Sequence, residues 1–320
     1  MTTAPTITLD DVFAVTLGGN TFGWTSDEAT SFAVLDAYTD AGGNHIDSAD
    51  SYSAFAPGNK GGESETIIGS WLAARGNRSD VFIATKVSQH PEYRGLAADN
   101  IRAAAEQSLH RLRTDHIDLY YAHFDDEAQD IADIAVSFDS LVRAGKVREI
   151  GVSNMSAARI SAWLDVAEAN GLARPVALQP HYNLLARETY EREYEPLAQQ
   201  FGLKVFPYFA LAAGFLTGKY RTPADVQGAD RERQLNSYGR EHAFRVVDVL
   251  VEVANEADVA PTTVALAWQL ARPSITAPIA SARVPGQLTD VLAAANLRLA
   301  DEQLARLEQV TASADELQGS

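Results

Sequence analysis

Runs of β-strand character and runs of helical character alternate along this chain, and this alternation constrains its fold more than any other feature. The strand-like runs are short and apolar, and they cover residues 13–17, 44–47, 81–87, 117–121, 148–152, 176–179, 204–208 and 275–279. Helical patterns follow them at residues 27–41, 63–75, 98–113, 129–144, 156–170, 189–201, 238–271 and 285–295. Capping residues support these assignments: Ser26-Asp27-Glu28 begins the first helix and Gly42-Gly43 ends it. Eight such repeats predict an α/β protein with a parallel sheet.

Two parallel architectures fit such repeats, a (β/α)8 barrel and an open doubly wound sheet. The doubly wound sheet predicts a glycine-rich turn of the form G-x-G-x-x-G after the first strand. Residues 18–23 are glycine-rich, but they do not match that spacing, and no acidic residue follows at the distance needed to bind a ribose. We therefore predict a (β/α)8 TIM barrel that forms a single domain over residues 1–320. Long loops at its C-terminal face and an extra C-terminal helix are expected as well.

Composition narrows the range of partners. The 320 residues include 26 Lys and Arg against 43 Asp and Glu, which gives a net charge of −17 at neutral pH. Nucleic acids and anionic membranes bind basic surfaces, so a small-molecule substrate is expected instead. The chain has no Cys, which excludes disulfides, thiolate metal ligands and a Cys nucleophile. Residues 1–11 do not resemble a signal peptide and no apolar run reaches membrane-spanning length, so we expect a cytoplasmic protein. The oligomeric state is left open.

Chemically active side chains stand at the ends of the predicted strands. From the second strand to the seventh they are Asp47, Lys86, His123, Ser153-Asn154, Gln179 and Tyr208. The C-terminal ends of barrel strands meet at one face, and active sites form there. Two long loops, residues 48–62 and 212–237, extend from the same face and are expected to act as lids or binding loops.

Several short motifs resemble those of the aldo-keto reductases, in order and spacing, over nearly the whole chain. The motifs are Asp47-Ser48-Ala49-Asp50-Ser51-Tyr52, Thr85-Lys86, His123, Gly151-Val152-Ser153-Asn154, Gln179-Pro180-His181-Tyr182-Asn183, Gly214-Phe215-Leu216-Thr217-Gly218-Lys219-Tyr220 and Ala282-Arg283. The resemblance implies hydride transfer between a nicotinamide cofactor and the carbonyl of an aldehyde or ketone. It also implies a catalytic tetrad, which consists of Asp47, Tyr52, Lys86 and His123.

The same resemblance assigns cofactor contacts. It implies that Ser153, Asn154 and Gln179 bind the carboxamide of the nicotinamide and that Tyr208 stacks on its ring. A loop over the pyrophosphate is implied for Leu211, Gly218 and Lys219. The further cofactor-binding candidates are Gly19, Asn20, Ser281, Arg283 and Gln287. No metal is expected.

Elementary electrostatics explains why a Lys and a Tyr belong together in such a site. An unperturbed Tyr has a pKa of about 10 and is a poor acid at neutral pH. A cation about 4 Å away, at an effective dielectric of about 20, contributes about 4 kcal/mol. We therefore expect Lys86 to lower the pKa of Tyr52 into a useful range, with Asp47 holding Lys86 in place. His123 is expected to donate a hydrogen bond to the substrate oxygen.

NADP(H) is the expected cofactor, and Arg283 is predicted to bind its 2′-phosphate. That group is a dianion, which a chain of net charge −17 repels at long range, so a local cation is needed. An Arg can form a two-pronged pair with phosphate. Arg283 precedes the predicted eighth helix, whose first turn is expected to offer backbone donors to an anion, and Gln287 lies one turn further on.

Aromatic side chains on the predicted loops are candidates for the substrate pocket, and they are Trp24, Phe55 and Phe124. Two alternatives to a reductase stay open. His45-x-Asp47 and His123-x-Asp125 have the spacing of ligand pairs in a metal-dependent TIM-barrel hydrolase, although Gln179 and Ala280 stand where further ligands are expected. The other alternative is a non-catalytic nucleotide-binding subunit on the same scaffold. We interpret His45 and His181 as structural residues.

Overall fold

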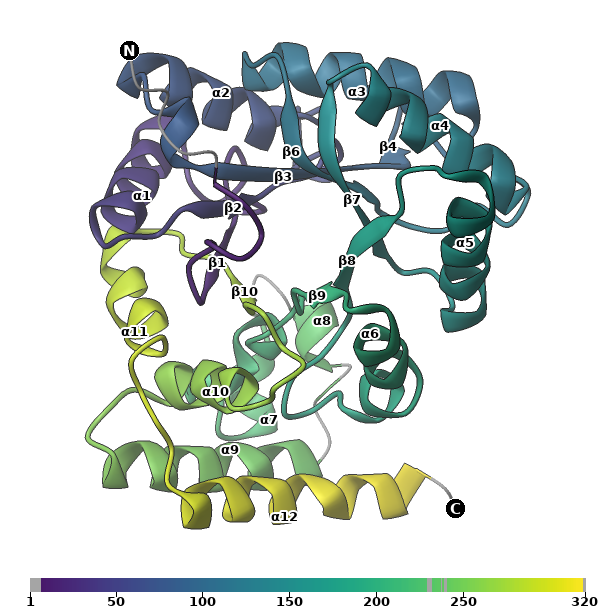
Figure 1. The fold of residues 1–320 in the computed structure, drawn as a ribbon. Coiled ribbons are helices and arrows are strands. Elements are labelled where there is room, and N and C mark those ends of the chain that lie inside the picture. The colour runs from purple at the N-terminus through teal and green to yellow at the C-terminus, as the bar shows by residue number, and fades with distance from the viewer. Residues whose placement is uncertain (1–6, 229–231, 237, 239–240, 319–320) are drawn as a thin grey trace.

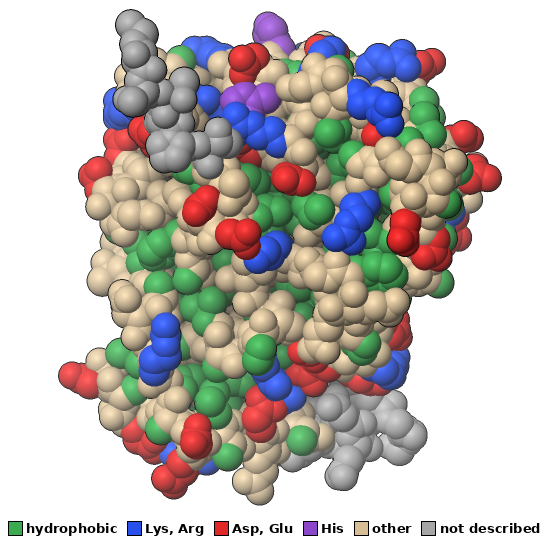
Figure 2. All heavy atoms as spheres, viewed as in Figure 1, with side chains coloured by type: hydrophobic (Ala, Val, Ile, Leu, Met, Phe, Trp, Pro, Cys, Tyr) green, Lys and Arg blue, Asp and Glu red, His purple; other side chains and the backbone are tan. Residues whose placement is uncertain are grey.

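The computed structural model describes residues 7–228, 232–236, 238 and 241–318. The predicted loop 212–237 and the predicted helical region 238–271 each include a few residues outside these ranges. Among the described residues, no helix is both long enough and apolar enough to cross a membrane. Acidic and basic side chains are interspersed over the face shown in Figure 2, so the excess negative charge does not form one patch there.

Eight parallel strands form the centre of the molecule, with helices around them (Figure 1). They are β1 (Thr16–Gly18), β2 (His45–Asp47), β3 (Phe82–Val87), β6 (Ile117–Ala122), β7 (Val147–Ser153), β8 (Pro175–Gln179), β9 (Lys204–Val205) and β10 (Ile279–Ala280). Neighbouring strands pair in the order β10-β1-β2-β3-β6-β7-β8-β9. Backbone hydrogen bonds of 2.9 Å, from Thr276 N to Val205 O and from Ile279 N to Pro207 O, join the two ends of this order. The predicted (β/α)8 barrel is confirmed.

Helices follow the strands on the outside of the barrel. They are α1 (Glu28–Asp40), α2 (Glu63–Arg75), α3 (Ala98–Leu112), α4 (Ile131–Arg143), α5 (Ala157–Asn170), α6 (Glu195–Phe201), α9 (Glu241–Glu256), α10 (Pro261–Leu270) and α11 (Leu288–Ala293). The predicted extra helix is α12 (Asp301–Gln318), which lies beside α9 (Figure 1). Two short helices, α7 (Pro223–Val226) and α8 (Glu232–Asn236), interrupt the long loop after β9.

Prolines explain where the predicted elements are divided or shortened. The predicted helical region 238–271 is two helices: α9 ends before Asp258, whose φ of 53° is left-handed, and Pro261 begins α10 in the first turn, where no backbone donor is needed. The predicted seventh and eighth strands, 204–208 and 275–279, contain Pro207 and Pro278. The observed β9 and β10 have two residues each and exclude both prolines, since proline cannot donate to a strand ladder. The eighth helix is a 3-10 turn, Pro285–Gln287, followed by the six residues of α11. A π-helical turn, Tyr190–Tyr194, precedes α6.

The small second sheet was not predicted. A short antiparallel pair, β4 (Gln89–His90) and β5 (Tyr93–Arg94), follows β3. The two strands are too short to show a period-two pattern in the sequence.

Side-chain alternation along the strands builds the site from the barrel core. An apolar cluster fills the interior and includes Phe82, Ala84, Leu119, Tyr121 and Ala177. Residues two apart on a strand face the same side, so the inward positions continue from Ala84 to Lys86 and from Ala177 to Gln179. The C-terminal end of the barrel is therefore lined by polar side chains that stand on an apolar layer.

Candidate active site

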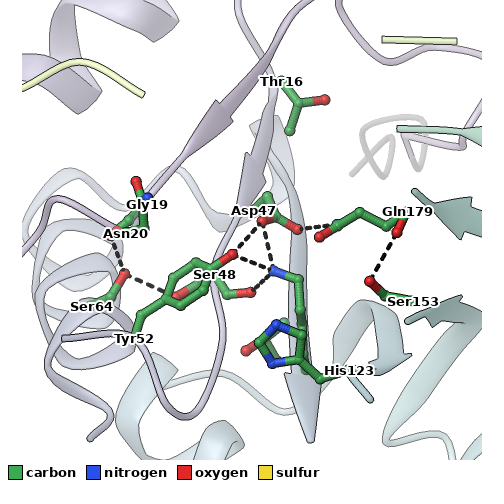
Figure 3. Close-up of polar contacts among 12 residues, drawn as sticks. Thr16, Gly19, Asn20, Asp47, Ser48, Tyr52, Ser64, His123, Ser153 and Gln179 are labelled. Carbon is green, nitrogen blue, oxygen red and sulfur yellow. Dashed lines mark hydrogen bonds and ion pairs between the residues drawn. The ribbon is translucent and has the colours of Figure 1, made fainter. Parts of the chain in front are cut away.

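The tetrad meets at the C-terminal end of the barrel (Figure 3). Asp47 ends β2 and Lys86 lies in β3, while Tyr52 is on the loop after β2 and His123 follows β6. The Nζ atom of Lys86 lies 2.6 Å from Asp47 Oδ2 and 2.9 Å from the Tyr52 hydroxyl oxygen. It also donates to the carbonyl oxygen of Ser48 at 2.6 Å. Lys86 is fully buried, so its three hydrogen bonds replace the water that it has lost.

Both carboxylate oxygens of Asp47 also accept hydrogen bonds. Its Oδ1 accepts from Gln179 Nε2 at 2.9 Å, and its Oδ2 accepts from the Tyr52 hydroxyl at 3.2 Å as well as from Lys86. Its backbone oxygen accepts from Gly19 N at 2.8 Å. A buried ion pair is stable only where such hydrogen bonds accompany it, so this network fixes the geometry of the site.

The pKa of Tyr52 differs from the sequence-based expectation. Burial raises the pKa of its phenol well above the ordinary value of 10, and the negative charge of Asp47 adds to the shift. Lys86 does not lower the pKa of Tyr52 as the sequence predicted. Its ammonium is paired with the carboxylate of Asp47, and the phenol is buried away from water. The phenol therefore holds its proton throughout the physiological pH range.

His123 is held in its neutral form. Burial and the nearby charge of Lys86 lower the pKa of its imidazole well below 6.5. Its ring lies 6.2 Å from that of Tyr52, and its buried Nδ1 has no hydrogen-bond partner among the described residues. A neutral imidazole carries one N–H, so His123 can donate a single hydrogen bond to an acceptor placed in the adjoining cavity.

A cavity of about 800 Å³ opens beside the tetrad. This volume is typical of cofactor and ligand pockets. Most of the predicted site residues line it: Asn20, Trp24, Tyr52, His123, Phe124, Ser153, Asn154, Gln179, Tyr208, Leu211, Lys219, Ser281, Arg283 and Gln287. Asp47 and Lys86 do not line the cavity and contact it through Tyr52 and Gln179.

Three predicted residues lie elsewhere. Gly19 is held between the backbone of Asp47 and the side chain of Ser64, whose hydroxyl donates to Gly19 O at 2.8 Å. Phe55 is 66% exposed and packs edge-on against Trp24, with 4.8 Å between the ring centroids. Gly218 ends a 3-10 turn, Ala212–Thr217, in a left-handed conformation with φ 78°.

The predicted nicotinamide contacts form a connected group. The Ser153 hydroxyl donates to Gln179 O at 2.8 Å, and Asn154 Nδ2 donates to His123 O at 2.9 Å. The Tyr208 hydroxyl donates to Asn154 Oδ1 at 2.8 Å. His181 stacks on the Tyr208 ring at 5.4 Å and 14°, so this ring is fixed both at its hydroxyl and on one face. These residues fit a planar amide-bearing ring because they offer amide and hydroxyl groups beside a rigid aromatic surface.

The turn after β9 has an unusual backbone. Ala212, Ala213 and Gly214 all have positive φ angles, of 47°, 56° and 100°. Ala212 N and Gly214 N are already engaged, since they donate to Phe209 O at 2.7 Å and to Leu211 O at 2.8 Å. The group that the turn can offer an anion is the ammonium of Lys219, whose Nζ would lie 3.7 Å from a Cβ on Gly214. Nothing in the sequence marks this feature, because alanine rarely adopts positive φ. For a pyrophosphate the turn therefore provides the charge of Lys219, which lines the cavity, rather than a set of backbone donors.

The cavity wall near Arg283 differs from what the sequence predicted. The predicted eighth helix begins as a 3-10 turn, and Gln287 Oε1 accepts from Arg283 N at 2.7 Å, so that oxygen is already engaged. Asp290 lines the same cavity and was not predicted, because a carboxylate in the first turn of a helix resembles an ordinary solvated residue in the sequence.

Three of the four residues of the metal alternative, His45, Asp47 and Asp125, are engaged in other contacts. His45 Nδ1 lies 2.9 Å from Thr16 Oγ1, and burial lowers the pKa of His45 to about 3. The Asp125 carboxylate accepts from Arg159 Nε at 2.9 Å. Within the described ranges, no group of three or more His, Asp or Glu is placed to hold a metal ion.

Comparisons with known proteins agree with this geometry. The model of the aldo/keto reductase family matches residues 14–312. The chain belongs to this family. Uncharacterized oxidoreductase YrpG of Bacillus subtilis is 35% identical over 92% of this chain and 90% of its own length. Protein tas of Escherichia coli is 32% identical over 94% of each chain. Norsolorinic acid reductase stcV of Emericella nidulans is 32% identical over 87% of this chain and 71% of its own length.

A second buried acid lies close to the tetrad. Asp50 is fully buried, and neither carboxylate oxygen has a hydrogen-bond partner among the described residues. Burial raises the pKa of Asp50 well above 3.8, and the charge of Glu65 raises it further. In the folded chain Asp50 thus keeps its proton at pH values where the unfolded chain has lost it.

We predict that Asp50→Asn stabilises the protein more at pH 7 than at pH 4.5. Folding stability falls as pH rises from the unfolded pKa towards the raised folded pKa, by about 1.4 kcal/mol for each pH unit in which only the unfolded carboxyl is ionised. Asn resembles the protonated acid and removes this loss. Urea unfolding of both proteins at the two pH values measures it, with the exposed Asp165→Asn on α5 as the control. A gain of equal size at both pH values would contradict the prediction.

Proposed function

We propose that the chain is an NADPH-dependent reductase of aldehydes or ketones in which Tyr52 is the general acid. The observation that carries this proposal is the contact of the Tyr52 hydroxyl with the buried Lys86–Asp47 pair, beside a neutral His and a cavity of dinucleotide dimensions. Family membership supports an oxidoreductase acting on carbonyl groups. The proposal includes a cytoplasmic location.

When bound, the dinucleotide would supply a hydride to the carbonyl carbon. His123 would donate its N–H to the carbonyl oxygen and align it beside Tyr52. The Tyr52 hydroxyl would pass its proton to that oxygen as negative charge develops there, and Lys86, already 2.9 Å away, would stabilise the resulting phenolate. Both side chains are in place before the reaction, and only the Tyr52 hydroxyl, which donates to Asp47 Oδ2 at 3.2 Å, has to turn its proton towards the carbonyl oxygen.

A raised pKa of Tyr52 is compatible with this role. Hydride arrival creates an alkoxide, whose basicity is comparable to that of hydroxide, the conjugate base of water with a pKa of about 15.7. Proton transfer from even a weakly acidic phenol to such an oxygen is favourable. The high pKa keeps the proton available, and the alkoxide draws it off only when the reaction needs it.

The non-catalytic alternative has less support. A chain that only bound a nucleotide would have no need of the buried ion pair, which costs several kcal/mol to desolvate. The relatives named norsolorinic acid reductase and oxidoreductase also favour a catalyst.

Tyr52→Phe should abolish most carbonyl reduction. Loss of a general acid typically lowers the rate by about 10²- to 10⁴-fold, and the phenyl ring preserves the packing. The kcat for NADPH oxidation with an aldehyde measures the loss, while fluorescence titration with NADPH should give a Kd within a few-fold of wild type. A variant that keeps more than about a tenth of the wild-type kcat would show that another group supplies the proton.

Lys86→Met and Asp47→Asn should each impair turnover, and their effects should be far from additive. Both act through one ion pair on one phenol, so the second change has little left to remove. A double-mutant cycle on kcat measures the coupling. Independent, additive losses would exclude the shared mechanism, whereas full inhibition by a chelator would favour the metal-dependent alternative.

Arg283→Ala should weaken NADPH binding by about 10- to 150-fold and leave NADH binding nearly unchanged, which corresponds to one charge-assisted contact. Asp290→Asn is the matched control, because it removes a carboxylate from the same wall and should move the NADPH affinity the opposite way. Fluorescence titrations with both cofactors measure the effects. Equal losses of NADPH and NADH affinity in Arg283→Ala would show that this side chain does not bind the 2′-phosphate.

A further inference from the structure

Asp50 belongs to the short segment that places Tyr52. After β2 the chain continues alongside β3, where Asp50 N donates to Lys86 O at 3.3 Å. The chain then turns, and Tyr52 N donates to Ala49 O at 3.2 Å. We call residues 49–52 the Tyr52 turn. Lys86 contacts this turn twice, with its carbonyl oxygen at Asp50 and with its Nζ at the Tyr52 hydroxyl, so the positions of Asp50 and Tyr52 are linked.

The side chain of Asp50 lies inside the protein, although its loop reaches the surface. Asp50 is fully buried, and neither carboxylate oxygen has a hydrogen-bond partner among the described residues. Residues 54–61, further along the same loop, are half-buried or exposed. An ionised carboxylate at position 50 would have lost water without gaining hydrogen-bond donors, which is strongly unfavourable.

The charges around Asp50 already balance one another. Glu65 of α2 pairs with Arg111 of α3 at 2.6 Å, and Lys86 pairs with Asp47 at 2.6 Å. An ionised Asp50 would add a third carboxylate to two cations. Burial raises the pKa of Asp50 well above 3.8 and Glu65 raises it further, while Arg111 and Lys86 only partly oppose the shift. The surroundings therefore favour the protonated acid.

The remaining titratable neighbours add no positive charge. Tyr120 of β6 is fully buried, and burial together with the charge of Asp50 raises the pKa of its phenol well above 10. His90 of β4 lies beside the same loop, because a Cβ on Gly61 would lie 2.7 Å from the His90 ring and 3.1 Å from Asp50 O. Burial lowers the pKa of His90. Both side chains are thus neutral at neutral pH, and neither can pair with an ionised Asp50.

We propose that the protonated carboxyl of Asp50 positions Tyr52, and that loss of this proton draws the Tyr52 turn away from Lys86 and stops reduction. An ionised Asp50 regains water only if the turn moves outward, and Tyr52 moves with it because one residue separates the two. The contact of 2.9 Å between Lys86 Nζ and the Tyr52 hydroxyl is then lost. The proton of Asp50 passes to water and never reaches the substrate, so Asp50 is a positioning residue. This inference rests on the proposed role of Tyr52 as the general acid.

The pH dependence of kcat/KM tests the proposal. NADPH is saturating, propanal is the substrate, and pH runs from about 6 to about 10, below the raised pKa of Tyr52. Wild-type kcat/KM should fall on the alkaline side by about ten-fold for each pH unit, because one proton is lost from one group. Asp50→Asn cannot ionise and resembles the protonated acid, so it should lose this alkaline fall. A level wild-type profile, or an equal fall in Asp50→Asn, which retains Tyr52, would overturn the inference.

Glu63→Gln is the matched control. Glu63 holds the far end of the same loop, where its carboxylate accepts from Lys60 N at 2.6 Å and from Gly61 N at 3.0 Å. The substitution loosens the loop but leaves Asp50 in place, so the alkaline fall in kcat/KM should persist. If Glu63→Gln removed the fall as Asp50→Asn does, the stability of the loop rather than the proton of Asp50 would be responsible.

Trypsin reads the position of the loop without any turnover. Lys60 is exposed and is the single Lys or Arg of residues 48–62, so cleavage there reports opening of the loop. Comparing wild type with Asp50→Asn at each pH cancels the pH dependence of trypsin. The ratio of their cleavage rates should rise with pH by up to about ten-fold per unit, since only the wild type gains a charge.

A cleavage ratio that stays constant with pH would show that the proton of Asp50 does not hold the Tyr52 turn, and would overturn the inference even if kcat/KM falls. The two levels of proposal fail differently. Absence of NADPH oxidation at every pH overturns the proposed reductase, while the trypsin comparison still decides whether the proton of Asp50 holds the turn.

Discussion

The buried ion pair between Asp47 and Lys86 is the interaction on which the rest of the site depends. Two charges withdrawn from water lose several kcal/mol each, and only complete hydrogen bonding can offset that loss. Gln179 from β8 and the carbonyl of Ser48 supply the remaining partners, so strands far apart in the sequence must lie in register for the pair to be stable. Tyr52 takes the last donor position on Lys86. The same arrangement that satisfies the charges therefore also places the proton donor.

The barrel makes this arrangement possible through strand alternation. Positions that face the interior are apolar along most of each strand and become polar at the last inward position, as in Ala84 to Lys86. Gly151 in β7 shows how closely this layer is packed, because a Cβ there would lie 2.3 Å from the ring of Tyr121. The tetrad thus rests on a closely packed apolar layer, and Tyr52, which comes from the long loop after β2, is held by its contacts with Lys86 and Asp47.

Sequence reasoning predicted the barrel from the periodicity of the apolar residues, and it predicted most residues of the cavity wall from their places at the ends of strands. Sequence reasoning failed where contacts between distant parts of the chain decide the local structure. The long helical pattern conceals the break at the left-handed Asp258, and the left-handed Ala212 and Ala213 carry no signal in the sequence. The direction of the Tyr52 shift was also wrong, because a distance to a cation does not reveal how much that cation is shared or how deeply the phenol is buried. In the sequence, Asp290 resembles an ordinary solvated helix residue, and only the structure shows that it lines the cavity.

The pKa directions of the two proposed donors bear on the direction of the reaction. Burial raises the pKa of Tyr52 and lowers that of His123, so at neutral pH the first holds its proton and the second is uncharged. Reduction of a carbonyl begins from this state, because it consumes a phenolic proton and needs a neutral N–H donor. Oxidation of an alcohol must begin from the phenolate, which becomes populated only as pH rises towards the raised pKa of Tyr52. Under the proposed function, the ionisation of the resting site therefore favours reduction at neutral pH, and the burial that stabilises the barrel end sets that preference.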